Sequence, residues 1–181
     1  SEEFLIAAIV SQDQGMMDAY ASGDVYLAFA KDAGMVPAEA TKKSHARIRE
    51  AAKATVLGIS YDMGANGLAP RIEAASGSPC TIEQAQGLID KVYEAYSNYW
   101  DWKQDIQRQY REEGYLSLPD GWVMWGDNDN HRSVGNFPVQ GLGSVIMRAA
   151  VKNAQDCGLD VVWTLHDAVY IEFPSDDLAC I

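Results

Sequence analysis

Side chains spaced four residues apart in residues 49–61 constrain the fold of this chain most strongly. Arg49, Lys53, Leu57 and Tyr61 recur at this interval in a segment that is otherwise rich in helix-forming residues. Residues four apart lie on one face of an α-helix. The spacing therefore predicts a helix that presents two cations, an aliphatic side chain and an aromatic ring along one face.

Two interpretations of this face are open. Two cations one helical turn apart can bind a polyphosphate, and a flat side chain beyond them can contact a base or a sugar. The alternative is a solvated Arg/Lys pair that leads into an ordinary core stripe. The segment alone does not choose between them.

Composition excludes several classes of protein. With 181 residues and 48% hydrophobic content, the chain can form a packed core. It has no apolar run near the roughly 18 residues that span a bilayer, and residues 4–10 are too short and lack the basic lead-in of a secretory signal. Cys80, Cys157 and Cys180 are too widely spaced to indicate a zinc ribbon or a disulfide framework. We therefore expect the protein to work in a reducing cytoplasm. If the protein is viral, this would be the cytoplasm of the host.

The charge is acidic overall but uneven. A net charge of −12 argues against a general nucleic-acid coat protein, yet 5 of the 14 cations lie within residues 42–53. An acidic body with one cationic face suits an enzyme that handles a phosphate ligand together with a divalent metal. It equally suits an ordinary acidic cytosolic protein.

Helical patterns dominate the first 113 residues. Gly64, Gly67 and Pro70 are expected to break the helical pattern, and Ser44 is the expected N-cap of the helix that carries Arg49. The predicted helices cover residues 3–11, 14–21, 25–32, 45–57, 82–96 (after a capping box at residues 81–84) and 99–113.

The pattern changes after Gly114. Residues 115–118 and 122–125 predict a hairpin, 126–130 a polar loop and 140–156 a helix. Residues 161–165 and 169–173 predict a second hairpin with His166-Asp167 at its turn. The sequence therefore predicts an α+β fold, in which a helix-rich middle (residues 25–113) sits inside a frame made from both ends.

Four motifs in this order resemble the family A DNA polymerases, the polymerase I type. The first is the helix motif R-x3-K-x4-G-x2-Y, from Arg49 to Tyr61. The second is His166-Asp167, which is similar to the His-Asp-Glu of the family's palm hairpin. The others are residues 1–5, which look like the tail of the first palm motif, and the R-x3-N-x-P-x-Q-G stretch at residues 132–141. The resemblance covers essentially all 181 residues.

The resemblance implies a polymerase palm, an antiparallel sheet with helices, and a mostly helical fingers subdomain. Residues 1–24 and 114–181 would belong to the palm, and residues 25–113 would be the fingers. The implied activity is template-directed DNA synthesis in replication and repair, by nucleotidyl transfer from a dNTP to a primer 3′-hydroxyl. The resemblance implies primer–template DNA and dNTPs as partners. It implies neither binding to a membrane nor formation of an oligomer.

The resemblance also assigns roles at the site of chemistry. Two Mg²⁺ ions would bridge the primer hydroxyl and the triphosphate. Asp167 would be one metal ligand, and the other ligands lie outside the chain. Arg49 and Lys53 would hold the triphosphate, with Lys53 a candidate proton donor to pyrophosphate.

The remaining roles concern the nucleotide and the duplex. Glu3 would block the sugar 2′ position, Leu57 would face the sugar and base, and Tyr61 would lie beside the nascent base pair. The expected contacts with primer–template DNA come from Arg132, Asn136, Gln140 and His166.

The chain departs from the family's pattern at several positions. It begins after the position of the family's other catalytic Asp, so we expect an internal fragment that is inactive alone. Ala168 replaces the usual Glu, and Asp62 follows Tyr61 where Gly is usual. Leu57 replaces an aromatic residue, as in phage-like members, and Trp122 replaces a common Arg.

Two other functions compete with DNA synthesis. A single-subunit RNA polymerase uses a similar helix and His-Asp hairpin, although Glu3 and the segment ending in Gln140 favour deoxynucleotides. A non-catalytic polymerase-like domain that binds nucleic acid is the second alternative, because Ala168 removes a carboxylate from the hairpin.

Overall fold

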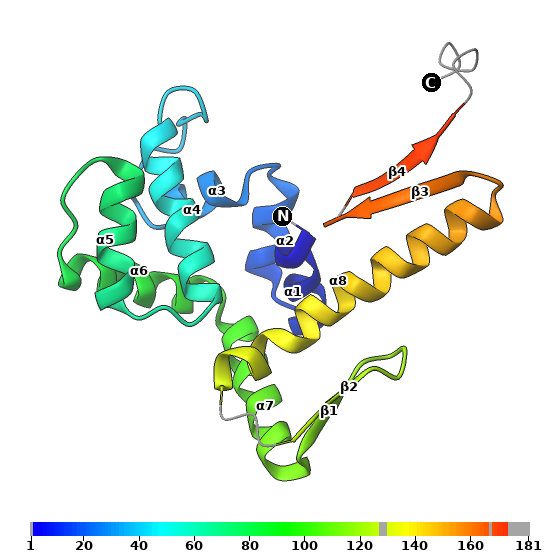
Figure 1. Cartoon of the computed structure of the whole chain (residues 1–181). Helices are drawn as coiled ribbons and strands as arrows, with labels where there is room; N and C mark the ends of the chain where they lie inside the picture. Colours follow the sequence, from blue (N-terminus) through cyan, green and yellow to red (C-terminus); the bar gives the residue numbers. More distant parts are fainter. Residues whose placement is uncertain (1, 127–129, 167, 174–181) are drawn as a thin grey trace.

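The computed structural model describes residues 2–126, 130–166 and 168–173. Within them the chain forms a helical body, a long helix that leaves this body, and two hairpins (Figure 1). None of the described helices is both long enough and apolar enough to cross a membrane. The helices are α1 (Glu2–Ser11), α2 (Gln14–Ala21), α3 (Val25–Asp32), α4 (Ala46–Ser60), α5 (Ala65–Ser76), α6 (Ile82–Ala95), α7 (Ser97–Glu113) and α8 (His131–Asp156). The strands are β1 (Tyr115–Ser117), β2 (Val123–Trp125), β3 (Asp160–Leu165) and β4 (Ala168–Glu172).

The main core lies in the helical body, where α4 packs against α3, α5 and α6. Small residues such as Ala51 and Ala52 make up much of the buried face of α4. They let neighbouring helices approach closely, and Phe29, Ile59 and Leu68 fill the space between them with almost no exposure. The core therefore buries one face of α4 and leaves the face with Arg49 and Lys53 only partly covered.

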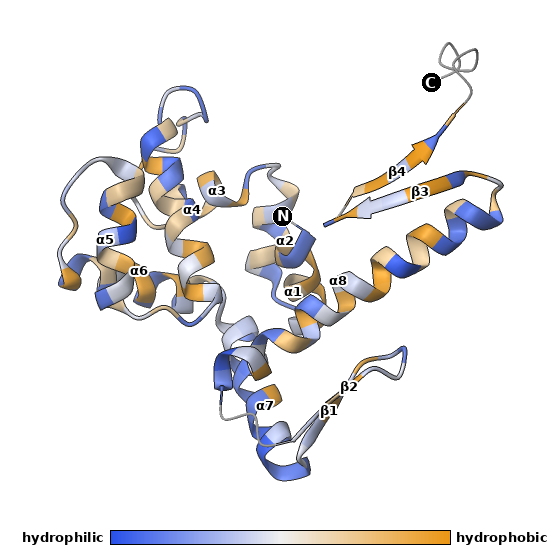
Figure 2. Cartoon of the chain, in the orientation of Figure 1, coloured by the Kyte–Doolittle hydropathy of each residue, from blue (hydrophilic) through white to orange (hydrophobic). Residues whose placement is uncertain are grey.

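Helix α8 is anchored mainly at its beginning, although Arg148 farther along also pairs with Asp120 in the turn between β1 and β2. Its buried residues, Val134, Gly135 and Val139, fall in the part that contacts α1 and α7. The rest of α8 extends away from the body with β3 and β4 beside it (Figure 1). Large side chains of this hairpin, including Trp163 and Tyr170, are exposed. Figure 2 shows orange, hydrophobic segments on both of its strands.

Both hairpins are antiparallel, as the sequence predicts. Leu116 pairs with Met124 in the first, and Leu165 pairs with Ala168 in the second. His166 has a φ of 52°, the left-handed conformation that a tight turn requires. Two small sheets joined to a helical body confirm the α+β class.

The expected break at Gly67 and Pro70 is wrong, because both lie inside α5. Leu68, Ala69 and Ile72 are buried in the core, and this burial outweighs the low helix propensity of Gly and Pro. Pro70 removes one backbone hydrogen bond, to the carbonyl of Asn66, but both residues are exposed to water.

Two other helix starts also differ from expectation. Ser44 does not cap α4; its hydroxyl contacts Thr41 and His45, and His45 is the N-cap residue. Helix α8 begins at His131 instead of residue 140, because the Asn130 side chain accepts from two backbone N–H groups and caps it there. The R-x3-N-x-P-x-Q-G stretch thus lies within α8, with Pro138 inside the helix.

Candidate active site

Helix α4 carries its two cations on one face, as the spacing predicts. The Arg49 guanidinium carbon lies 5.4 Å from the centroid of the Tyr26 ring, and the Lys53 ammonium lies 5.9 Å from it. Tyr26 belongs to α3, which packs along α4. The electron-rich face of a tyrosine ring attracts cations, so this ring holds both side chains on the same side of α4.

Arg49 is already paired with carboxylates. Its Nε donates to Asp24 Oδ2 at 2.6 Å, and its Nη1 donates to Glu50 Oε1 at 2.8 Å. The side chains of Arg49 and Asp24 are only 14% and 19% exposed, whereas that of Glu50 is 50% exposed. Asp24 is therefore the stronger partner, because its pair with Arg49 is better shielded from water.

Asp24 has a second task as the N-cap of α3, where its side chain accepts from the backbone N–H of Leu27 at 3.1 Å. Burial tends to raise the pKa of this carboxyl, but the hydrogen bonds from Arg49 and Leu27 outweigh burial and hold the pKa below its ordinary value. The hydrogen bond with Asp24 in turn raises the pKa of Arg49. Sequence reasoning does not identify this pair, because the two residues are 25 positions apart.

Tyr61, just beyond the end of α4, connects three segments. Its hydroxyl donates to Glu3 Oε2 at 3.1 Å and accepts from Gln140 Nε2 at 3.3 Å. Glu3 lies in α1 and Gln140 in α8, so three residues predicted for the site meet at one oxygen. Burial and the nearby Glu3 carboxylate raise the pKa of Tyr61, which keeps the phenol protonated at neutral pH.

This arrangement leaves Tyr61 available to a ligand. The residue is 46% exposed. Leu57, one turn earlier on α4, is half-buried, so part of its side chain also faces outward. The three predicted residues of α4 therefore line one partly exposed face, which ends at the Glu3–Tyr61–Gln140 cluster just beyond the helix.

The other residues predicted to bind DNA are more scattered. Asn136 is half-buried on α8 and Arg132 is exposed one turn before it, while His166 is exposed at the turn of the second hairpin. Within the described residues, neither Arg132 nor His166 is hydrogen-bonded to the Glu3–Tyr61–Gln140 cluster. The predicted metal ligand, Asp167, lies outside the described residues, and those that are described form no cluster of three or more metal-binding side chains.

Two residues that sequence reasoning did not single out for the site support the end of α4. Lys103 of α7 is buried and donates to the backbone carbonyl of Ser60 and to the carboxylate of Asp62. These acceptors lie on either side of Tyr61. The one signal of this contact in the sequence is Asp62, which stands where the family usually has Gly.

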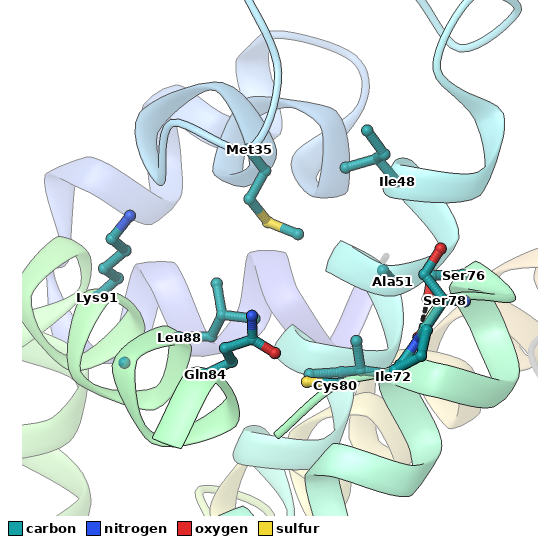
Figure 3. A pocket seen from close by; sticks show the side chains of 12 residues that line it. Met35, Ile48, Ala51, Ile72, Ser76, Ser78, Cys80, Gln84, Leu88 and Lys91 are labelled. Carbon is teal, nitrogen blue, oxygen red and sulfur yellow. Dashed lines mark hydrogen bonds between the residues drawn. The ribbon is translucent and has the colours of Figure 1, made fainter. Parts of the chain in front are cut away.

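A cavity of about 490 Å³ lies elsewhere, between α4, α5 and α6 (Figure 3). Its lining is largely apolar and includes Met35, Ile48, Ile72 and Leu88. None of the described residues predicted for the site lines it. The candidate site is therefore an open face of the molecule and not this cavity.

Comparison with protein families gives a match along almost the whole chain. The model of the family described as DNA polymerase family A matches residues 2–181. DNA polymerase I of Aquifex aeolicus is 28% identical over 181 residues, which cover 94% of this chain and 30% of that protein. DNA polymerase I of Pseudomonas aeruginosa is 30% identical over 191 residues, covering 96% of this chain and 20% of that protein.

A solved structure shares the fold. The POL domain of Pol1 from M. smegmatis, in complex with DNA primer-template and dNTP, has a TM-score of 0.78 and 24% sequence identity. The match covers 99% of this chain and 33% of that one. The chain thus spans about a third or less of the length of these relatives.

Proposed function

Because the chain belongs to DNA polymerase family A, we propose that the full-length protein carries out template-directed DNA synthesis. The reaction transfers a nucleotidyl group from a dNTP to the 3′-hydroxyl of a primer. The observation that carries the proposal for this chain is the Tyr61 hydroxyl, which contacts both Glu3 and Gln140 at the end of the cationic face of α4.

Arg49 and Lys53 bind the triphosphate in this proposal. The partial exposure of Lys53, and the placement of both cations beside Tyr26, support this role. Negative charge builds on the leaving pyrophosphate, and a nearby ammonium stabilises it and can donate a proton to it. Arg49 donates to Asp24 through Nε and to Glu50 through Nη1, so the triphosphate competes with these carboxylates for the guanidinium charge.

Glu3, Leu57 and Tyr61 select the nucleotide. The Glu3 carboxylate, held by the Tyr61 hydroxyl, excludes a 2′-hydroxyl from the space beside it. Leu57 faces the sugar and base one turn before Tyr61. Gln140 acts from α8 as a donor to minor-groove acceptors, which all correctly formed base pairs present in similar positions.

Arg132, Asn136 and His166 complete the proposed contacts with primer–template DNA. Their exposure or partial exposure supports this role. The proposed division of the chain into palm (residues 1–24 and 114–181) and fingers (residues 25–113) is supported by the contacts of α4 with α3, α5 and α6 and by those of α1 with α8.

Polymerases of this family use divalent metal ions, and we include Mg²⁺ with Asp167 as one ligand in the proposal. The described residues alone do not form a metal site. When bound, the metal would stabilise the negative charge that develops on the phosphate groups.

The test is nucleotide incorporation by the purified full-length protein on a primed DNA template with Mg²⁺. We expect extension with dNTPs and little with rNTPs, and we expect Asp167→Asn to serve as an inactive control. Equal use of rNTPs would indicate the RNA polymerase alternative. Tight binding of primer–template without any extension would indicate a non-catalytic domain and would refute the proposal.

A further inference from the structure

Lys103 is a buried cation on the face of α7 that also buries Tyr99 and Trp100. It is 2% exposed, and its ammonium donates to the carbonyl of Ser60 at 2.7 Å and to Asp62 Oδ1 at 3.0 Å. The rings of Tyr99 and Trp100 lie 6.0 and 5.3 Å from the same ammonium. Removing an ammonium from water is costly, and burial lowers the pKa of Lys103 despite the Asp62 carboxylate.

The partners of Lys103 lie immediately before and after Tyr61. Asp62 has a φ of 55°, a left-handed conformation that an L-residue adopts at a cost. Its second carboxylate oxygen, Oδ2, is buried without a hydrogen-bond partner among the described residues. The contact with Lys103 therefore holds a strained and partly unsatisfied residue next to Tyr61.

Helix α8 rests directly on the same lysine. A side-chain carbon on Gly135 would lie 2.7 Å from Lys103 Cε and 2.9 Å from Gln107 Nε2, so any larger residue would have to displace one of these side chains. Gln140, which contacts the Tyr61 hydroxyl, follows Gly135 in α8 by about one and a half turns. Lys103 thus contacts both the segment that presents Tyr61 and the helix that presents Gln140.

We infer that Lys103 is a positioning residue for nucleotide selection, fixing Tyr61 against Glu3 and Gln140 by tying Ser60 and Asp62 to α7 where α8 packs on it. This inference rests on the proposed DNA synthesis. Stability alone does not require a lysine here, since a well-packed apolar group can replace a buried ion pair without loss. Lys103 binds the residues on both sides of Tyr61, Ser60 and Asp62, and it thereby fixes the position of the tyrosine.

The experiment compares three variants of the full-length protein. Lys103→Met keeps an unbranched chain but removes both hydrogen bonds. Lys103→Met with Asp62→Gly also removes the unpaired carboxylate and the left-handed strain. Lys91→Met is the matched control, because Lys91 also donates to a backbone carbonyl, that of Ala33, but does so from α6. Each variant is measured for thermal unfolding and for kcat and KM with dNTPs and rNTPs.

We expect Lys103→Met to lower both the melting temperature and the dNTP-over-rNTP ratio of kcat/KM, the latter by about 10-fold. The double variant should recover most of the melting temperature but not the ratio, because the Ser60 carbonyl still lacks its donor. Lys91→Met should leave the ratio unchanged.

A double variant with a normal ratio would overturn the inference and leave Lys103 as a structural residue. Failure of both Lys103 variants to fold would also overturn it, since the lysine would then be a folding determinant. An unaltered protein that incorporates no nucleotide is a separate outcome: it refutes the proposed function, and the inference falls with it.

Discussion

The Tyr61 hydroxyl donates to the carboxylate of Glu3 across 58 positions of sequence, at 3.1 Å. This hydrogen bond joins the end of α4 to the beginning of α1, and Gln140 completes the group from α8. The phenol thereby orients a carboxylate that would otherwise rotate freely on an exposed first turn.

Tyr61→Phe is expected to weaken discrimination against ribonucleotides. The ring stays in place, but Glu3 loses its donor and can turn away from the sugar. A single hydrogen bond contributes about 0.5–1.5 kcal/mol, which corresponds to a change of about 2-fold to 12-fold in selectivity. Competition between dNTP and rNTP on one template measures this, and unaltered selectivity would show that Tyr61 does not orient Glu3.

Lys53→Ala in the full-length protein should lower nucleotide incorporation far more than primer–template affinity. The ammonium is proposed to meet the triphosphate, whose charge builds on the leaving group, and losses of this kind reach about 10²–10³ in rate. Steady-state incorporation and a DNA-binding titration on the same preparation check it. Near-normal turnover of the variant would show that Lys53 does not bind the triphosphate.

Asp24→Asn is expected to lower the KM for dNTPs by about 10-fold, because a charged competitor for Arg49 is lost. Asparagine still accepts a hydrogen bond as an N-cap, so α3 should remain intact. Glu50→Gln is the matched control: Glu50 also pairs with Arg49 but is half exposed, so its loss should change KM little. Equal effects of the two variants would contradict the role of Asp24.

Asp24 should also contribute to acid sensitivity. Its folded-state pKa lies below the ordinary value of an aspartate, so the folded protein binds fewer protons than the unfolded chain as the pH falls toward that value. The stabilisation is present above the unfolded pKa and is lost as the pH falls through the folded value. Unfolding free energies measured between pH 6 and about pH 3 should therefore fall less steeply for Asp24→Asn than for the unaltered protein. Parallel curves would show that the carboxyl has no special stabilisation.

Leu57→Tyr should ease discrimination against 2′,3′-dideoxynucleotides. Leucine has no hydroxyl and no π face, so it cannot compensate for the missing 3′-hydroxyl of such a nucleotide. If Leu57 is instead only a core residue, overpacking should cost about 1–3 kcal/mol of stability. Melting temperature and dideoxy selectivity of one preparation separate these results: a lower melting temperature with unchanged selectivity would make Leu57 a core residue.

Much of the fold follows from local sequence. The four-residue spacing from Arg49 to Tyr61 predicts α4, the capping box at Thr81 predicts α6, and both hairpins form where the turn residues predict them. These features depend on interactions between near neighbours, which a sequence displays directly. The α+β class and the order of the polymerase motifs are determined at the same level.

Tertiary structure decided the rest. Pro70 and Pro138 lie inside helices because burial of neighbouring side chains outweighs local propensity. Arg49 meets Asp24, and Lys103 meets Asp62, across 25 and 41 positions of sequence. No periodic pattern records such pairs, because they depend on how helices pack and on which charges that packing removes from water. The sequence thus determined which side chains are available to the site, and packing between helices decided which of them meet.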